Sequence, residues 1–471
     1  MSKVASALLF SPLTLGARPG LLLRARTWVP AMVTWRGDPC GEVTDSHLLW
    51  YERIAEGKPA VLVVEATGIS DVPSGPLLRI HDDQFIPGLS RLVEVVRKAS
   101  GGETRLFLQL IHFLRVRRRP TSQKYFAEFL QPTAAHAQAL QLSFDTPAKV
   151  IREAFASLPP EGWQHVLSPR EWQDLAYGAR ERVTDMHLPH VRDLPHSLPP
   201  AFAAAAARAE AAGFDGVELH FAHAYTLASL LSPLNTRQDG YGGNLEQRLR
   251  LPLDVFRAVR NNTSPAFIVG CRYLAEECVA GGHTPAEAAT MGVAFASAGF
   301  DFLSLSRGGK FEDARQPPVG KAAYPYTGHS GAECIPPERL RKQAQGDPRG
   351  RNVLATAQVR RAIRDAGFAT PVVLAGGIHT SAHAEAALQA GHADVIATAR
   401  QTLADPLWLI KLQAGEEHTI RQCTRSNYCE GLDQMHKQVT CKLWDRLPHA
   451  PDEPTSPTAE DGRRLLPPRA W

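Results

Sequence analysis

The chain has 471 residues, of which 44% are hydrophobic and 21% charged, a composition typical of a globular protein with a large core. Its 52 Lys and Arg barely exceed its 48 Asp and Glu, and no apolar run reaches the roughly 18 residues of a membrane span. We therefore expect a cytoplasmic protein that binds neither nucleic acid nor membrane. Seven cysteines scattered over so long a chain do not indicate a disulfide framework.

Eight short apolar segments recur along the chain, and most are followed by a loop and a stretch of helical hydrophobic spacing. They are residues 27–35, 60–67, 105–112, 214–221, 266–273, 301–306, 371–376 and 393–400. Alternation of strand and helix predicts an α/β protein with a parallel sheet, and eight units favour a closed (β/α)8 TIM barrel. A doubly wound open sheet is the alternative, but no G-x-G-x-x-G motif follows the first strand.

The spacing also divides the chain. We assign residues 1–447 to the barrel and expect residues 1–37 to be structured protein rather than a targeting segment. Residues 115–198 are too long for a plain connection after the third strand, so we predict an insertion, either a lid over the mouth or a surface addition. Residues 448–471 are rich in Pro and charged residues and predict an extended C-terminal tail.

The residues that could carry chemistry follow the predicted strands, because barrel enzymes place function at the C-terminal ends of their strands. These positions hold Gln109, His112, His220, His223, Tyr225, Arg272, Gly376, Gly377, Ala399 and Arg400. The glycine pair and Arg400 suit the phosphate site that barrels often build after strands seven and eight, since glycine lets backbone N–H groups approach phosphate closely.

His220 and His223 are the most informative pair. Two imidazoles three residues apart, just past a strand, could donate hydrogen bonds to one oxygen or could ligate a metal. A metal-dependent hydrolase would require a third ligand from another strand end, and none is evident beside Gln109 and Arg272. We therefore predict no metal site.

At this point the sequence resembles the old yellow enzyme family of FMN-dependent NADH:flavin oxidoreductases. The resemblance is carried by residues 10–13, 65–66, 82–89, 109–112, 213–220, 231–235, Arg237, Asp239, 241–243, Arg248, 270–272 and 405–406. Together these motifs span about residues 9–441, apart from the insertion.

The resemblance implies an FMN held at the barrel mouth, reduced by NADPH or NADH and reoxidised by the activated C=C bond of an enone-type small molecule. The implied FMN-binding residues are Met32, Val33, Ala66, Gln109, His220, Arg272, Gly376, Gly377, Ala399 and Arg400. In this reading His220 and His223 bind the substrate carbonyl oxygen, and Tyr225 donates a proton to the α-carbon. The arginine near the flavin would stabilise its anionic reduced form.

Several positions depart from the family pattern. Val33 stands where the family usually has Thr or Cys near the flavin, while Leu114, Ala224 and Ala399 each replace a family glycine. Cys423, Cys429 and Cys441 resemble the iron–sulfur cysteines of the dienoyl-CoA-reductase branch, but Ser426 stands where a further cysteine is expected. We expect these cysteines to remain reduced thiols without a cluster. We also expect electrons to pass directly from the nicotinamide to the flavin, because no dinucleotide-binding domain follows.

Two other functions are consistent with the same residues: an amine or other dehydrogenase that runs the flavin in the oxidative direction, and a flavin-binding protein without turnover.

The chain ends in an apolar pair, two prolines, Arg469 and Trp471. Family members with a similar ending imply that Arg469 reaches a neighbouring subunit, with Trp471 as anchor, so we allow for a homo-oligomer.

Overall fold

The structure is a computed structural model that describes residues 8–16, 19–72, 75–279, 281–308, 319–320, 350–449 and 457–469. Its centre is a closed parallel barrel with the strand order β10-β3-β4-β5-β6-β7-β8-β9. The strands are β3 (Thr27–Val29), β4 (Val61–Gly68), β5 (Arg105–Ile111), β6 (Gly216–Phe221), β7 (Ile268–Leu274), β8 (Leu303–Ser306), β9 (Val372–Ala375) and β10 (Val395–Ala397). The predicted TIM barrel is therefore confirmed, with one strand in each of the eight predicted segments.

The first strand is shorter than predicted. The segment 27–35 was expected to be extended throughout, but β3 ends at Val29. Pro30 has no N–H to donate to a neighbouring strand, and Trp35 adopts a left-handed backbone with φ of 55°. The residues after Val29 instead form part of the barrel mouth.

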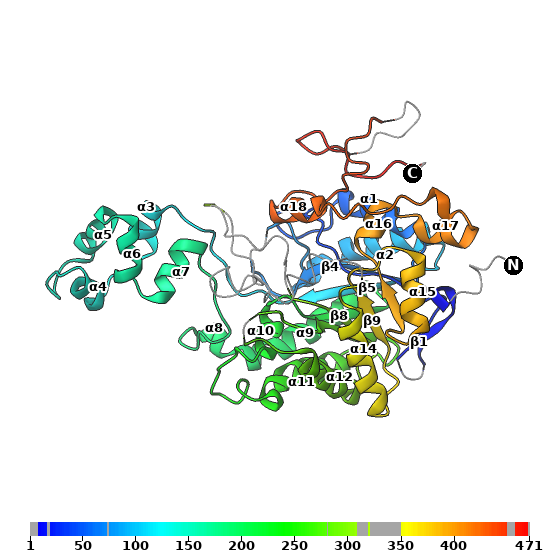
Figure 1. The fold of residues 1–471 in the computed structure, drawn as a ribbon, viewed down its shortest axis with the longest axis horizontal. Helices are drawn as coiled ribbons and strands as arrows, with labels where there is room; N and C mark the ends of the chain where they lie inside the picture. The colour runs from blue at the N-terminus through cyan, green and yellow to red at the C-terminus, as the bar shows by residue number, and fades with distance from the viewer. Residues whose placement is uncertain are drawn as a thin grey trace.

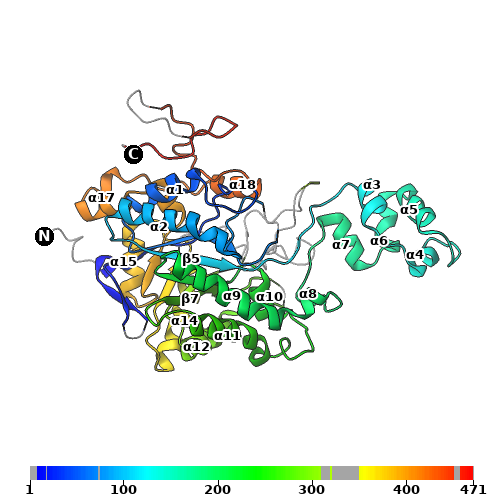
Figure 2. The same cartoon turned by 180° about the vertical axis from the view of Figure 1, so that it is seen from behind.

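Helices surround the barrel on its outer face (Figures 1 and 2). They are α1 (Asp45–Ala55), α2 (Ile86–Ser100), α9 (Leu194–Ala211), α10 (Thr226–Leu231), α11 (Leu245–Asn261), α12 (Pro285–Ala298), α14 (Val353–Asp365), α15 (Ser381–Gln389), α16 (Arg400–Ala404), α17 (Trp408–Ala414) and α18 (Tyr428–Gln434). Their apolar stripes pack on the strands, as the helical spacing of Leu89, Leu92, Val93 and Val96 in α2 illustrates, since all four are buried. Among the described residues, no helix is long and apolar enough to cross a bilayer.

The barrel interior is filled by aromatic side chains. Trp28 packs against Phe107 and Phe302, with ring centroids 5.4 and 4.9 Å away. Gly270 faces this layer, where an added Cβ would lie only 2.3 Å from a ring carbon of Phe302, so no other residue fits. A hairpin of β1 (Leu13–Leu15) and β2 (Leu21–Leu23) packs onto the same cluster, on the side of the barrel away from the insertion (Figure 1).

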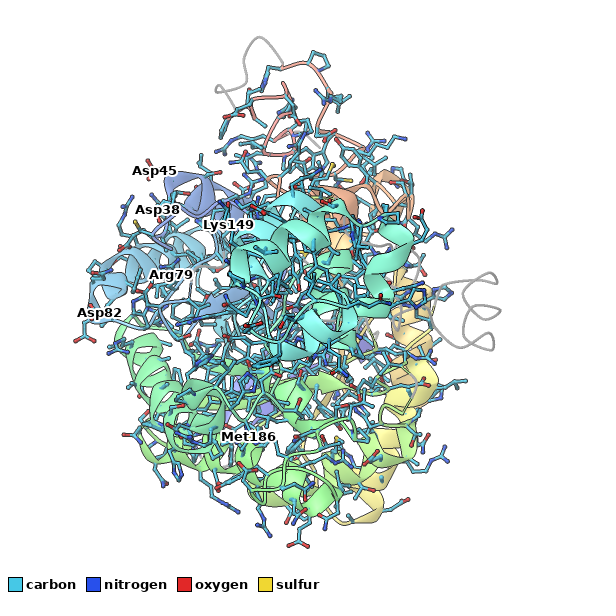
Figure 3. The ribbon with its side chains drawn as sticks, turned by 90° about the vertical axis from the view of Figure 1, so that its left-hand side faces the viewer. Asp38, Asp45, Arg79, Asp82, Lys149 and Met186 are labelled. Atoms are coloured by element: carbon cyan, nitrogen blue, oxygen red, sulfur yellow. The ribbon has the colours of Figure 1, made fainter. Side chains whose placement is uncertain are left out.

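The segment after β5 forms a separate group of helices that projects from one side of the barrel (Figure 1). It comprises α3 (Ser122–Lys124), a π-helical turn (Tyr125–Phe129), α4 (Ala134–Ala139), α5 (Ala148–Ser157), α6 (Pro160–Val166), α7 (Pro169–Tyr177) and α8 (Pro189–Arg192). Its own small core includes Tyr125, Phe126 and Phe155. In Figure 3 this group faces the viewer, with Lys149 of α5 in front of the barrel.

The described part of the C-terminal tail, residues 457–469, is anchored to the barrel. Arg463 and Arg464 are buried, and the Leu465 carbonyl accepts a 2.8 Å hydrogen bond from buried Arg36. Arg469 Nη1 lies 3.8 Å from Glu56 Oε1 of the same chain, and Trp471 lies outside the described residues.

Candidate active site at the mouth of the barrel

A cavity of about 720 Å³ opens at the C-terminal ends of the strands. The residues implied for catalysis and FMN binding all line this one cavity: Met32, Val33, Ala66, Gln109, His220, His223, Tyr225, Arg272, Gly376, Gly377, Ala399 and Arg400. Residues more than 350 positions apart meet here because all eight parallel strands end at the same edge of the barrel. His112, which also follows β5, is absent from the lining and pairs with Thr226 Oγ1 at 2.9 Å.

A buried polar network on neighbouring strands, which we call the deep wall, consists of Gln109, His220 and Arg272, which line the cavity, and of Glu218 and Ser304, which do not line it but bond to Gln109 and Arg272. Gln109 and Glu218 lie opposite each other in the β5–β6 register, and Gln109 Nε2 donates to Glu218 Oε1 at 2.6 Å. Arg272 lies opposite both His220 and Ser304, and its Nη1 donates to Ser304 Oγ at 2.9 Å.

Burial shifts the pKa of both charged groups in the deep wall, Glu218 and Arg272, towards the neutral form, and their opposite charges counteract part of this shift. Burial raises the pKa of Glu218, while Arg272 and the amide of Gln109 act in the opposite direction. Burial likewise lowers the pKa of Arg272, which the charge of Glu218 offsets. Sequence reasoning missed Glu218 and Ser304. Strand alternation offered a signal for Glu218, because residues 218 and 220 share one face of β6.

The two histidines contact each other. His223 Nδ1 lies 3.3 Å from His220 Nε2, and His223 Nε2 lies 2.8 Å from Ser306 Oγ. Burial, then His223 and Arg272, lowers the pKa of His220 well below its ordinary value, so this imidazole is neutral. Its Nδ1 is buried with no hydrogen-bond partner in the described part of the chain. Both rings line the cavity, so a small turn of either ring that breaks their mutual contact would let both donate to one ligand oxygen.

The loop after β6 has a strained backbone. His223 and Ala224 both have positive φ, 58° and 55°, which side chains with a Cβ adopt at a cost. This explains why the resembling family has glycine at position 224. Ala399, another replaced glycine, directly precedes Arg400 and has φ of −90°, so it needs no glycine.

Tyr225 lies beside the histidines and keeps its proton. Its ring centroid is 5.6 Å from that of His220 and 5.2 Å from that of Phe113. Burial, followed by the charge of Asp433, raises the pKa of Tyr225. A protonated phenol beside the neutral imidazole of His220 is a suitable proton donor.

The opposite end of the cavity combines the backbone of two glycines with the positive charge of Arg400. Gly376 and Gly377 have φ of 110° and 82°, a left-handed conformation that glycine adopts without strain. Arg400 begins α16 and its Nη1 donates to Asn427 Oδ1 at 2.6 Å. This end therefore offers accessible backbone and a positive charge, as a phosphate group requires.

The end of the first strand supplies an apolar edge. Met32 and Val33 line the cavity, and the next residue, Thr34, fixes them by donating from its N–H and its hydroxyl to Glu65, both at 2.7 Å. Glu65 is itself held by His47 Nε2 at 2.8 Å, with both side chains fully buried. Val33 therefore gives this edge of the cavity an apolar methyl surface, whereas the hydroxyl of Thr or the thiol of Cys at the same position would make it polar.

The three clustered cysteines lie behind Arg400. Cys423, Cys429 and Cys441 line a cavity of about 20 Å³ together with Ser426. Burial raises the pKa of Cys429 to about 12 and that of Cys441 to about 11, so both thiols are protonated at neutral pH. Within the described residues no group of His, Cys, Asp and Glu is arranged to hold a metal ion. A four-iron cluster, which needs four thiolates and far more room, does not fit this pocket.

The closed barrel thus places a buried arginine, a histidine pair and a glycine pair around one cavity, an arrangement that suits a large phosphorylated ligand at the barrel mouth. The model of the NADH:flavin oxidoreductase / NADH oxidase family matches residues 196–332. This chain is therefore similar to that family of oxidoreductases over residues 196–332.

Individual relatives extend the match. The chain is 26% identical over 412 residues to an NADH oxidase of Thermoanaerobacter brockii, covering 86% of this chain and 51% of that protein. It is 24% identical over 459 residues to an N,N-dimethylglycine/sarcosine dehydrogenase of Chromohalobacter salexigens, covering 94% and 54%. The structure of the old yellow enzyme homologue from Zymomonas mobilis superposes with a TM-score of 0.54 at 20% identity, covering 86% and 92%, which shows the shared fold. The chain thus spans about half the length of these two curated relatives.

The residues present fit FMN. The cavity is large enough for a drug-sized or nucleotide-sized ligand, which needs roughly 300–1,000 Å³. The left-handed glycines and Arg400 suit its phosphate, and the buried donors Gln109 and Arg272 suit the polar edge of its ring.

Proposed function

We propose that this chain reduces the activated C=C bond of an α,β-unsaturated carbonyl compound. The observation that carries the proposal is the grouping of His220, His223 and Tyr225 in the cavity that also contains Arg272 and the two glycines. Bound FMN would supply the hydride-transfer chemistry, with NADH or NADPH as the source of the hydride.

The histidines would bind the substrate through its carbonyl oxygen. The oxygen takes the place of the 3.3 Å contact between His220 Nε2 and His223 Nδ1 and accepts a hydrogen bond from each. Ser306, bonded to His223 Nε2, fixes the orientation of that ring. Two donors at the oxygen withdraw electron density from the conjugated C=C bond, which makes the β-carbon electrophilic.

Tyr225 would complete the addition. Its hydroxyl, which burial keeps protonated, donates a proton to the α-carbon after the β-carbon has received hydride. Arg272 would hold a positive charge beside the ring-binding wall. Met32 and Val33 would provide an apolar contact on the other side of the site.

The test uses p-hydroxybenzaldehyde as a probe for the oxygen site. The phenolate should lie over the flavin and give a long-wavelength charge-transfer band. The double variant His220→Ala/His223→Ala should lose the band while FMN stays bound, and Tyr225→Phe should keep the band but lose alkene reduction. A full band in the double histidine variant would show that the oxygen site lies elsewhere.

A second function is oxidative amine dehydrogenation, which is favoured by the relative named N,N-dimethylglycine/sarcosine dehydrogenase. The depressed pKa of His220 keeps it neutral and able to accept a proton from a substrate ammonium group. Anaerobic addition of sarcosine or NADPH to separate samples distinguishes the two. Bleaching of the flavin by sarcosine supports the amine reaction, and bleaching by NADPH followed by reoxidation with 2-cyclohexenone supports the alkene reaction.

A further inference from the structure

The insertion reaches the cavity through its neck, which we define as residues 115–119 and 178–184. The outgoing and returning segments pair side by side: Val116 and Arg180 form an antiparallel bridge, Arg117 N–H donates to Ala179 O at 2.7 Å, and Glu181 N–H donates to Arg115 O at 3.0 Å. Gly178 allows this approach, because an added Cβ would lie 2.7 Å from Arg117 O and its φ is 97°. The neck is therefore a paired ribbon.

One face of this ribbon forms a wall of the cavity. The neck residues that line it are Val116, Arg118, Arg180, Glu181, Arg182, Val183 and Thr184. The neck contains six arginines and a single acid, Glu181. That carboxylate is already occupied, since it accepts from Arg115 N–H at 3.0 Å and lies 2.9 Å from His190 Nε2. The cavity wall made by the neck is therefore strongly cationic.

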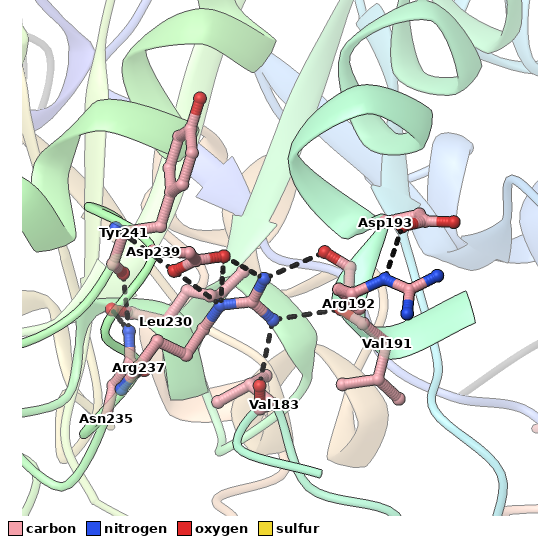
Figure 4. A network of polar contacts seen from close by, with 9 residues as sticks. All are labelled: Val183, Val191, Arg192, Asp193, Leu230, Asn235, Arg237, Asp239 and Tyr241. Carbon is pink, nitrogen blue, oxygen red and sulfur yellow. Dashed lines mark hydrogen bonds and ion pairs between the residues drawn. The ribbon is translucent and has the colours of Figure 1, made fainter. Parts of the chain in front are cut away.

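The neck is fixed to the barrel by Arg237, whose side chain is fully buried. Arg237 Nη1 donates to the carbonyls of Val183 and Val191, and Nη2 donates to that of Arg192, all at 2.9 Å (Figure 4). Asp239 pairs with the same guanidinium. Because these bonds tie the returning segment to the loop after α10, the neck arginines keep a defined position relative to His220 and His223.

We propose that Arg118, Arg180 and Arg182 form an anion-binding rim for a phosphate or carboxylate group carried by the molecule that enters the cavity. This inference rests on the proposed function and adds a charged recognition element to it. Two sources supply such a group: the phosphates of the nicotinamide donor, or an acidic substituent on the unsaturated substrate. Planar guanidinium groups bind both kinds of oxyanion by paired hydrogen bonds.

The three rim positions differ in exposure and surroundings. Arg118 is exposed, whereas Arg180 and Arg182 are half-buried. Asp174 lies near Arg117, Arg170 and Arg182, and its negative charge reduces the contribution of Arg182 most. A wall with one sign of charge concentrates the oppositely charged ligand, so the three arginines together should attract an anion into the cavity.

The experiment compares charged and uncharged probes in the holoenzyme. The variant is Arg118→Gln/Arg180→Gln, and the matched control is Arg115→Gln, which removes an exposed neck arginine that does not line the cavity. The donors are NADPH, NADH and the uncharged 1-benzyl-1,4-dihydronicotinamide, with flavin bleaching as the signal. The acceptors are 2-cyclohexenone and a cyclohexenone bearing a carboxylate.

The double variant should weaken the apparent affinity for the charged probes by roughly 10-fold, while the uncharged probes change less than about twofold. The difference between wild type and double variant in apparent affinity for the charged probes should shrink as salt rises, because exposed charges are screened beyond about 10 Å at 0.1 M ionic strength. A loss confined to NADH and NADPH identifies the donor phosphates as the ligand, and a loss confined to the carboxylate-bearing enone identifies the substrate. Either result supports the rim. Equal changes for charged and uncharged probes, or no change, would overturn it.

A binding measurement separates this inference from the proposed function. Calorimetric titration of the oxidised holoenzyme with NADP⁺ and with the carboxylate-bearing enone requires no turnover. If no donor bleaches the flavin, the proposed function fails, yet weaker binding of either anion by the double variant still supports the rim. If wild type, double variant and Arg115→Gln bind both anions equally, the rim is wrong whether or not the enzyme turns over.

Discussion

The deep wall and the insertion neck line the same cavity but are built in opposite ways. The deep wall places few charges on adjacent barrel strands, and its members are buried, with Gln109 bonded to Glu218 and Arg272 bonded to Ser304. The neck places many arginines on an irregular ribbon, and the three that line the cavity are exposed or half-buried. One wall suits a group that stays bound, and the other suits molecules that enter and leave.

The physical reason is the dielectric environment. A charge in the deep wall is costly without its partners, so its position and protonation are tightly determined. A charge on the neck is hydrated and screened by salt, so each neck arginine contributes less binding energy than a buried charge does. Substitutions in the two walls should therefore differ in size and in kind.

The largest effect is expected from removing the carboxylate of the deep wall. Glu218→Ala leaves the guanidinium of Arg272 buried without its counter-charge and the Gln109 amide without its acceptor, so we expect a loss of about 3 kcal/mol in unfolding free energy. Urea unfolding of the purified protein measures it. Glu218→Gln keeps an acceptor for Gln109 and should lose less. Unchanged stability in Glu218→Ala would contradict the view that this wall depends on charge pairing.

The next effect concerns the cofactor. Arg272→Ala removes the fixed positive charge of the deep wall, and losing a charge-assisted contact should weaken FMN binding by about 1.5–3 kcal/mol and lower the flavin potential. Fluorescence titration of released FMN and a redox titration give the two quantities. Arg118→Gln on the neck is the control and should leave the potential unchanged. If both variants shift the potential alike, the distinction between the walls is lost.

A smaller effect tests the loop after β6, where His223 and Ala224 have positive φ. Ala224→Gly should stabilise the protein by about 1 kcal/mol, because Ala224 has a left-handed backbone that glycine adopts without steric cost. Thermal unfolding measures the shift. The matched control is buried Ala222→Gly, which has no such strain and should destabilise. Opposite signs for two alanines two residues apart would be hard to explain by any other cause.

The smallest effect is expected behind Arg400, in the cysteine pocket. Anaerobically purified protein should contain no stoichiometric iron or acid-labile sulfide, because two of the three thiols are held protonated and Ser426 completes the pocket. Replacing Cys423 with Ser should leave the visible spectrum that of a flavin alone. Iron and sulfide near about four per chain would instead make Cys423, Cys429 and Cys441 ligands.

The strand-end residues were predictable because they obey a local rule. Short apolar segments located the strands, and barrel topology brings the strand ends together, so Gln109, His220, Arg272 and Gly376 could be assigned to one site from their positions alone. Glu218 was missed because its neighbours in the sequence are apolar, and a lone buried carboxylate is recognised only when the opposite strand is known. The contact between His220 and His223 also depends on side-chain geometry.

The sequence by itself determined the barrel, the order of its strands and the residues at their ends, because these follow from hydrophobic periodicity and from turns of a few residues. Only the tertiary structure decided that the insertion neck lines the cavity, since its approach depends on bonds between Arg237 and carbonyls some 45 to 54 residues earlier. Such long-range backbone contacts leave no periodic pattern in the chain. The arginine cluster was visible in the sequence, but its place in the same cavity as His220 and His223 was not.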